Sequence, residues 1–190
     1  MAARDKAILD AALELFAEHG FAAVGVDRIG ERAGVPGPAI YRHFSGKAEL
    51  LATLVDQAMD HLLALTAGSA EDPHEELALL VRGHVRFALS HRLLLAVYAQ
   101  EARSLPPDDR RRARRRQRAY VERWVDVLGR VHREHSDVEL RVAAHGAIGL
   151  IQASINWPRA LLGAPGLAAA IEAAALRTLG VAHATDAAAR

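Results

Sequence analysis

Tyr41, Arg42 and His43 form a run of three hydrogen-bond donors that lies between Ile40 and Phe44. Because Ile40 and Phe44 are four residues apart, they fall on one face of a helix and leave the other faces to the polar run. Arginine can donate to a guanine edge, and tyrosine and histidine can donate to phosphates. The spacing therefore predicts a short helix that reads the major groove of DNA.

Three further residues extend this candidate site. Ala39 can contact a thymine methyl group. Lys47 places a cation at the start of the next helix, where backbone N–H groups also favour a phosphate. Arg28 is another candidate for a phosphate contact. An ordinary helical corner shows the same apolar spacing, so the outward tyrosine, arginine and histidine are what favour DNA binding.

The elements that must position these residues follow from apolar spacing and turn residues. Residues 5–19 have the apolar periodicity of an amphipathic helix, and residues 26–33 predict a second helix of about two turns. A turn over residues 34–37 follows, and Pro38 suits the first turn of a third helix. These segments predict a helix-turn-helix, after which a longer fourth helix begins.

The rest of the chain also reads as helices, because prolines and a Ser-Asp pair separate its apolar stretches. Aromatic residues make up only 5% of the chain and β-branched clusters are scarce, so no sheet is expected. A hydrophobic content of 51% is enough to bury a core. The predicted fold class is therefore all-α. The later helices are predicted at residues 73–90, 92–103, 107–134, 137–157 and 164–180.

Two stretches carry a resemblance: FAAVGVDRIGERAGV from Phe21 to Val35, and PAIYRHFSGKAELL from Pro38 to Leu51. Together they resemble the DNA-binding domain of the TetR family over about the first 60 residues. The resemblance implies that Pro38, Ala39, Tyr41 and His43 face DNA on a recognition helix, with Arg42 beside them, and that Lys47 contacts the DNA backbone.

The sequence departs from the family pattern at Val24 and Gly25, where serine or threonine is common. Gly25 can still cap a helix, but it has no hydroxyl to donate to a phosphate. We therefore expect the DNA affinity to depend more on Arg28 and Lys47.

The resemblance also implies the organisation of the chain. An N-terminal three-helix helix-turn-helix DNA-binding domain is expected over residues 1–61, and a C-terminal helical ligand-binding and dimerisation domain over residues 62–190. One helix-turn-helix touches few phosphates, so a homodimer on a palindromic operator is expected, with recognition helices about 34 Å apart. The last two helices, rich in small residues, are expected to form an intersubunit four-helix bundle, and burial within one chain is the alternative.

The expected function is a ligand-responsive transcriptional regulator, a repressor that a small apolar or acyl-type effector releases from its operator. The resemblance implies an apolar pocket among the later helices, with a few polar groups that orient the ligand. The same aromatic residues also suit an ordinary core. The candidate ligand-binding residues are Phe87, Tyr98, Arg103, Tyr120, Trp124, Gln152 and Trp157.

The segment from Arg110 to Arg118 contains seven arginines in nine residues. One interpretation is the solvated start of a helix. The other is an anion site for a phosphorylated effector such as an acyl-coenzyme A, since arginine pairs bidentately with phosphate. The layout from Glu101 to Pro107, followed by this run, resembles actinobacterial-type TetR regulators of lipid metabolism.

Other functional classes have little support in the sequence. There is no Gly-x-Ser-x-Gly, Walker-type or His-Glu-x-x-His motif, so no enzyme is expected. The absence of cysteine excludes disulfides and thiolate metal sites. His132 and His135 have a spacing that suits a metal, but no third ligand is evident, so they are expected to be surface histidines. No cofactor is predicted.

The N-terminus lacks the pattern of a secretory signal, and the apolar stretches are too interrupted to span a membrane. A cytoplasmic location without membrane contact is expected. The net charge of +1 is uninformative about nucleic acids, so DNA binding depends on local placement. The alternative function is a helical interaction or ligand-binding module that has lost DNA binding, for which the glycine at position 25 is the only hint.

Overall fold

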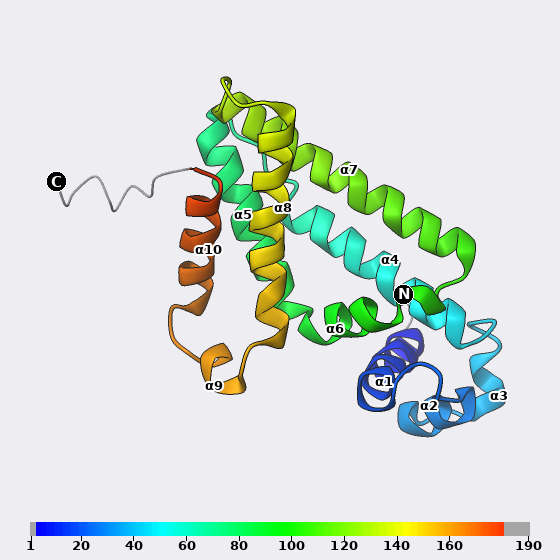
Figure 1. The fold of residues 1–190 in the computed structure, drawn as a ribbon. Helices are drawn as coiled ribbons and strands as arrows, with labels where there is room; N and C mark the ends of the chain where they lie inside the picture. Colours follow the sequence, from blue (N-terminus) through cyan, green and yellow to red (C-terminus); the bar gives the residue numbers. More distant parts are fainter. Residues whose placement is uncertain (1–2, 181–190) are drawn as a thin grey trace. The chain divides into compact units, whose positions relative to one another are not determined.

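A computed structural model describes residues 3–180 of the chain. Within that range every regular element is a helix, and no strand is present, which confirms the predicted all-α class (Figure 1). The elements are α1 (Ala3–His19), α2 (Val26–Ala33), α3 (Gly37–Ile40), α4 (Lys47–Leu65), α5 (Pro73–Ser90), α6 (Arg92–Glu101), η1 (Ala102–Ser104), α7 (Pro107–Val131), α8 (Asp137–Ala153), η2 (Ser154–Asn156), α9 (Arg159–Leu162) and α10 (Leu167–Thr178).

The helices predicted to begin at residues 73, 92, 107 and 137 begin there, whereas α10 begins at Leu167, three residues after the predicted start. The prediction for residues 73–90 matches α5, whereas the one for 92–103 divides into α6 and the 3-10 helix η1. The short helix α9, after Pro158, was not predicted. A four-residue helix has too little periodicity to be recognised in a sequence.

The chain forms two compact units, and the first combines Met1–Asp60 with His91–Arg115. Its core joins α1, α2, α3 and the first part of α4 to residues of α6, such as Leu94 and Val97. The packing of α6 against α1 is supported by Glu101, whose Oε1 accepts a hydrogen bond of 3.1 Å from the Phe21 amide. The helix-turn-helix therefore rests on a helix that lies far away in the sequence.

The second unit combines His61–Ser90 with Arg116–Arg190. Helices α5, α8 and α10 pack against one another in it (Figure 1). The start of α8 is fixed by a capping box, in which Ser136 and Glu139 bond each other's backbone amides. Trp124 and Leu128 of α7 are fully buried. Both α4 and α7 run without a break from residues of one unit to residues of the other.

The division at residue 61 into a DNA-binding and a ligand-binding domain is a functional prediction, and it stays a prediction. Residues 181–190 of the predicted second domain lie outside the described residues. Of the helices described, none combines the length and the apolarity needed to cross a membrane.

Candidate nucleic-acid interface

The turn between α2 and α3 depends on two close backbone approaches. Gly34 ends α2 in the left-handed conformation, with φ of 68°, and the Val35 amide donates to the Gly30 carbonyl over 2.9 Å. A Cβ atom on Gly30 would lie 2.7 Å from the Val35 oxygen, and one on Gly37 would meet the Asp27 carboxylate. These glycines let the two helices meet at the corner of a helix-turn-helix.

The third helix presents its polar run to solvent. Ile40 is fully buried and Phe44 is 8% exposed, as their spacing predicts, while Tyr41 is 59% exposed and Arg42 and His43 are also exposed. The regular helix ends at Ile40, earlier than the predicted helix through Phe44, although the Phe44 amide still bonds the Ile40 carbonyl at 2.9 Å, four residues back. The His43 amide bonds the Ile40 carbonyl at 2.8 Å, three residues back, as in a 3-10 turn.

His43 has a partner that the sequence does not reveal. Its Nδ1 lies 2.7 Å from Oδ1 of Asp5, near the start of α1. The His43 side chain keeps 31% of its surface exposed beside this partner, and the Asp5 side chain keeps 24%. The contact links His43 to α1, the first helix of the unit.

Arg28 lies on the exposed face of α2, and one of its guanidinium nitrogens is 2.7 Å from Nε2 of His19. At the start of the same helix, Gly25 is the N-cap residue and provides no side-chain hydrogen bond. The backbone of Gly25 has φ of −95° and ψ of 159°, which any residue can adopt. The missing hydroxyl is therefore a property of the side chain and not of the local backbone.

The Lys47 ammonium group is engaged within the protein. It donates to the backbone carbonyls of Phe21, Ala22 and Val24 at 2.8, 3.1 and 3.0 Å, and it lies 4.6 Å from the centre of the Phe21 ring. A lysine has three N–H donors, and all three have acceptors here. A phosphate contact by Lys47 requires that one of these bonds be shared or broken.

Three of the candidate ligand residues come together in the second unit. Phe87, Tyr120 and Trp124 surround His84, whose Nδ1 is hydrogen-bonded to the Tyr120 hydroxyl at 2.9 Å. Burial lowers the pKa of His84 to about 4, so its ring is neutral at neutral pH. The Trp124 indole Nε1 is buried beside the Tyr120 hydroxyl.

His84 is not among the ligand-binding residues predicted from the sequence, although the sequence holds a signal for its burial. It falls on the same helical face as Leu77, Leu80, Val81 and Ala88, all of which are buried. A histidine within an apolar stripe must be buried as well, and it then needs a polar partner. Tyr120 is that partner.

The other four candidate ligand residues do not join this cluster. Tyr98 and Arg103 belong to the first unit, where Tyr98 packs against the helix-turn-helix core and the Arg103 carbonyl accepts a bond from Arg110. Gln152 and Trp157 lie partly buried at and beyond the end of α8.

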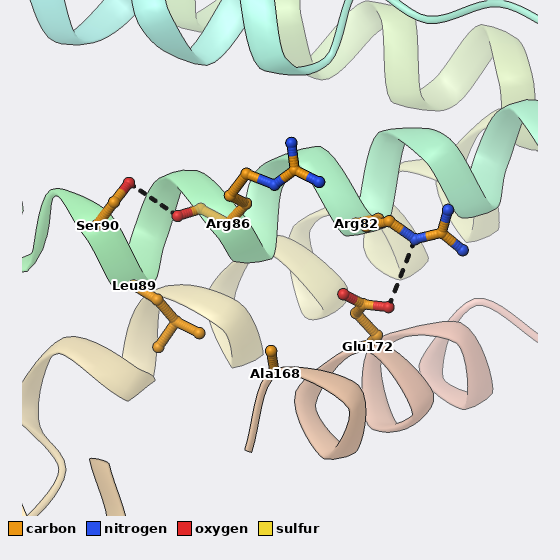
Figure 2. Close-up of a pocket in the computed structure, with 6 residues that line it drawn as sticks. All are labelled: Arg82, Arg86, Leu89, Ser90, Ala168 and Glu172. Atoms are coloured by element: carbon orange, nitrogen blue, oxygen red, sulfur yellow. Dashed lines mark hydrogen bonds and ion pairs between the residues drawn. The ribbon is translucent and has the colours of Figure 1, made fainter. Parts of the chain in front are cut away.

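A groove with a volume of about 520 Å³ lies between α5 and α10 in the second unit (Figure 2). Arg82 in this groove has its Nε 3.8 Å from Oε2 of Glu172, while Ala168 leaves room opposite α5. None of the candidate ligand residues lines it. Its lining residues are Arg82, Arg86, Leu89, Ser90, Ala168 and Glu172.

The arginine run from Arg110 to Arg118 lies in the first half of α7, and nearby carboxylates neutralise part of its charge. Arg111 pairs with Asp108, and Arg112 pairs with both Asp56 and Asp109. Hydrogen bonds and charge from these carboxylates raise the pKa of Arg112 further above its usual range. Arg114 and Arg115 are exposed.

Two family models match the chain. The model described as "Bacterial regulatory proteins, tetR family" covers residues 8–54, and the one described as "Tetracyclin repressor-like, C-terminal domain" covers residues 70–161. The first match includes α2, the turn, α3 and the start of α4.

Curated relatives match parts of the chain. The transcriptional activator FasR of Mycolicibacterium smegmatis is 42% identical over 57 residues, which are 30% of this chain and 26% of FasR. The transcriptional repressor KstR2 of Mycobacterium tuberculosis is 29% identical over 131 residues, 64% of this chain and 62% of KstR2. The chain thus aligns with less than two thirds of either relative.

Solved structures match nearly the whole chain. The ketosteroid transcriptional regulator KstR2 of Mycobacterium tuberculosis has a TM-score of 0.80 at 26% identity, with 95% of each chain covered. A bacterial regulatory protein of the tetR family from Rhodococcus RHA1 has a TM-score of 0.84 at 23% identity, with 96% of this chain and 100% of that chain covered. The all-α fold of both units therefore has known counterparts.

Proposed function

The chain belongs to the TetR family of DNA-binding transcriptional regulators, and we propose that it is a homodimeric repressor that a small apolar or acyl-type effector releases from a palindromic operator. One observation carries the DNA-binding part of this proposal. Tyr41, Arg42 and His43 are exposed side by side while Ile40 and Phe44 anchor the same turn in the core.

The proposed contacts divide into base reading and phosphate binding. Arg42 donates to a guanine edge in the major groove, and Pro38 and Ala39 provide apolar contacts such as that with a thymine methyl group. Tyr41 and His43 donate to phosphates. Pro38, Tyr41, Arg42 and His43 are exposed, and Ile40 and Phe44 anchor the same short segment in the core, which supports these roles.

Arg28 and Lys47 are the proposed additional phosphate contacts. Arg28 supports this role by its exposure on α2. Lys47 can reach a phosphate only in competition with the three carbonyls that it now contacts. We therefore assign the larger share of phosphate binding to Arg28.

The proposed dimer forms through α8 and α10. Val138 and Val142 on α8 are 68% and 66% exposed, and exposed glycines at positions 146 and 149 continue that face. Helix α10 packs beside α8 and exposes Ala168–Ala170. Bulky apolar side chains together with small residues suit close helix packing between two subunits.

The proposed effector site lies in the second unit, around His84. Phe87, Tyr120 and Trp124 form a buried apolar cluster there, and the hydrogen-bonded pair of His84 and Tyr120 is the polar group that can orient a ligand. The name of KstR2 associates that protein with ketosteroids, which are largely apolar molecules, and this supports the apolar class of effector. The repressor role is likewise supported by KstR2, which aligns with more of this chain than the activator FasR does.

An acyl-coenzyme A is the proposed acyl-type effector, with its phosphates on the arginine run. Because Arg111 and Arg112 already pair with carboxylates, and the proposed effector site lies in the second unit, the exposed Arg118 of that unit is the proposed phosphate contact. Replacing Arg118 with glutamine should weaken acyl-coenzyme A binding in calorimetry. Unchanged affinity would remove the phosphate contact from the proposal and leave an effector bound by its apolar part.

Release of the dimer from its operator requires that the effector bind one of two protein conformations more tightly than the other. We place the change in α4, because this helix contains residues of both units. Effector entry tilts α4 and moves the two recognition helices away from their groove spacing. Only a difference in effector affinity between the two conformations can drive that shift.

A gel shift with the DNA upstream of the chain's own gene tests the proposal. Binding at moderate salt should weaken as salt rises. Arg42→Gln should lower the operator affinity by about tenfold or more and relax the base preference at the position that Arg42 contacts. Arg159→Gln, on the exposed helix α9, should leave the operator affinity unchanged. The absence of a shift at low salt, or an equal loss of affinity in both variants, would contradict the proposed role of Tyr41, Arg42 and His43 in DNA binding.

A further inference from the structure

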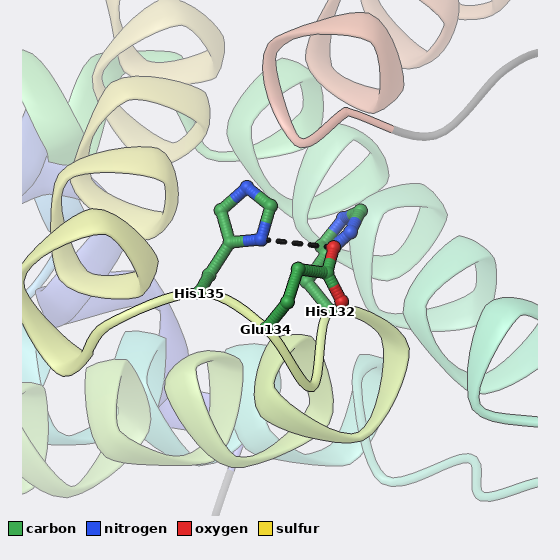
Figure 3. A group of neighbouring side chains, drawn as sticks. All are labelled: His132, Glu134 and His135. Atoms are coloured by element: carbon green, nitrogen blue, oxygen red, sulfur yellow. Dashed lines mark ion pairs between the residues drawn. The ribbon is translucent and has the colours of Figure 1, made fainter.

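His132, Glu134 and His135 gather in the turn between α7 and α8, within the second unit (Figure 3). Each offers a nitrogen or oxygen atom, and these three atoms all lie within 4.8 Å of one another. The sequence shows the two histidines, but it does not show that the turn brings the carboxylate between them. That carboxylate is the third ligand that the spacing of the histidines alone does not provide.

Two of the three atoms already have a separation that a metal ion accepts. His135 Nδ1 lies 3.1 Å from Glu134 Oε1. Ligand atoms about 2.0–2.1 Å from a tetrahedral zinc ion lie about 3.3 Å from each other. An ion can therefore replace the proton between these groups with little movement, and both side chains are exposed enough to adjust.

His132 is oriented by a second contact. Its Nε2 is 2.7 Å from the carbonyl oxygen of Leu179, at the end of α10. A carbonyl can only accept, so Nε2 carries the hydrogen and Nδ1 of the neutral ring keeps a free lone pair. Histidine ligands of metals commonly donate their other ring N–H to a backbone carbonyl in this way, which fixes the tautomer and the ring.

We propose that His132, Glu134 and His135 form a binding site for one divalent transition-metal ion of the zinc class. Two imidazoles and one carboxylate suit zinc, nickel or copper, whereas magnesium and calcium favour oxygen ligands alone. Three protein ligands leave a fourth position for water. The ion links the turn after α7, through His132, to the end of α10, so it braces helices of the second unit.

Calorimetric titration of the full chain, freed of any histidine tag, with zinc chloride tests the site. We expect one zinc ion per chain. His135→Ala and Glu134→Gln should each weaken binding at least tenfold, and both side chains are exposed, so these variants should keep the fold. His74→Ala is the matched control, because His74 is an exposed histidine beside a single carboxylate, that of Asp72. It should bind zinc like the unchanged chain.

A second measurement uses stability. A ligand that binds only the folded state raises the melting temperature, so zinc should raise it for the unchanged chain and for His74→Ala, and much less for His135→Ala. A stoichiometry well below one, or equal loss of binding in His74→Ala and His135→Ala, would overturn the proposal. Zinc affinity that survives both His135→Ala and Glu134→Gln would overturn it as well.

Discussion

The imidazole of His43 lies 2.7 Å from the carboxylate of Asp5, although 38 positions separate the two residues in the chain. The contact links the segment just after α3 to α1. A partner of this kind restricts the orientation of the imidazole before DNA arrives, which reduces the entropy lost on binding. Asp5 is therefore a positioning residue for the proposed contact of His43 with a phosphate.

Substitution of this pair should show that the two residues act together. His43→Ala should lower the operator affinity of the proposed dimer by about thirtyfold, because it removes one hydrogen bond of about 1 kcal/mol from each subunit. Asp5→Asn should lower it less, and it should have no further effect in the His43→Ala background. Fluorescence anisotropy on the four proteins measures this coupling. Additive effects in the double variant would show that Asp5 acts independently, and Asp10→Asn is the exposed control.

Lys47→Met separates a structural role from a phosphate contact. Methionine keeps the length and apolar character of the stem but cannot donate to the three carbonyls. We expect the free energy of unfolding to fall by about 1.5–3 kcal/mol, the range for hydrogen bonds to charged groups. The exposed control Lys6→Met, which removes only a surface pair with Asp10, should cost less than about 1 kcal/mol.

The salt dependence of DNA binding gives the second readout for Lys47→Met. A residue that neutralises one phosphate contributes about one unit to the slope of log affinity against log salt. We expect Lys47→Met to lower that slope by less than one unit per subunit, because the three carbonyls compete with the phosphate for Lys47. A slope reduced by about two units, one for each subunit of the proposed dimer, would show that Lys47 exchanges its carbonyls for a phosphate when DNA binds.

Gly30 should tolerate no side chain, in contrast to Gly25. In Gly30→Ala the new methyl group meets the backbone oxygen of Val35 at 2.7 Å and the Gly37 backbone at 3.0 Å, so the turn must shift. Overpacking of this kind costs about 1–3 kcal/mol of stability. In Gly25→Ser the new side chain enters open space and can cap α2, which should add a few tenths of a kcal/mol. Urea denaturation measures the free energy of unfolding of both variants. A change of the same sign in both would contradict the different surroundings assigned to Gly30 and Gly25.

The sequence was sufficient for elements that depend on local chemistry. The burial of Ile40 and Phe44 follows from their spacing, and the end of α2 at Gly34 follows from the freedom of glycine at positive φ. The bounds of α5 could be predicted because a proline begins it and its apolar residues recur with helical periodicity.

Contacts between distant residues could not be predicted in the same way. The pairing of Asp5 with His43, and of Glu101 with the Phe21 amide, depends on how α1 meets α3 and α6. A polar surface residue has the same sequence pattern whether or not a partner lies across from it. The capture of Lys47 by carbonyls is a similar case, because the acceptors are backbone atoms and have no signature in the sequence.

Val142→Glu should disrupt the proposed dimer. Val142 is 66% exposed on α8, next to the small residues of the proposed interface, and a carboxylate buried there without a partner is costly. We expect the variant to elute as a monomer in size-exclusion chromatography with light scattering, and to lose high-affinity operator binding. Arg177→Glu, at the exposed end of α10, tests how far the interface extends. A dimeric Val142→Glu would place the interface elsewhere.

The buried His84 should make stability depend on pH in a defined window. Its pKa is about 4 in the folded chain, because of burial, against about 6.5 in the unfolded chain. Between these values the unfolded chain binds a proton at His84 that the folded chain does not. The contribution of His84 to stability is therefore fully present above about pH 6.5 and is lost progressively as the pH falls towards 4.

Full loss of this contribution amounts to roughly 3 kcal/mol at 1.36 kcal/mol per pKa unit. Urea denaturation at several pH values between 7.5 and 4.5 measures it, with His84→Gln as the variant, because glutamine does not titrate. His84→Gln should be less stable at pH 7.5, since the bond with Tyr120 and the packing are altered, but its stability should decline less steeply with falling pH. His145→Gln, at an exposed position of α8, should follow the unchanged chain throughout. Equal slopes for His84→Gln and the unchanged chain would mean that His84 is hydrated and titrates normally in solution, and the cluster around Trp124 would then be open to water.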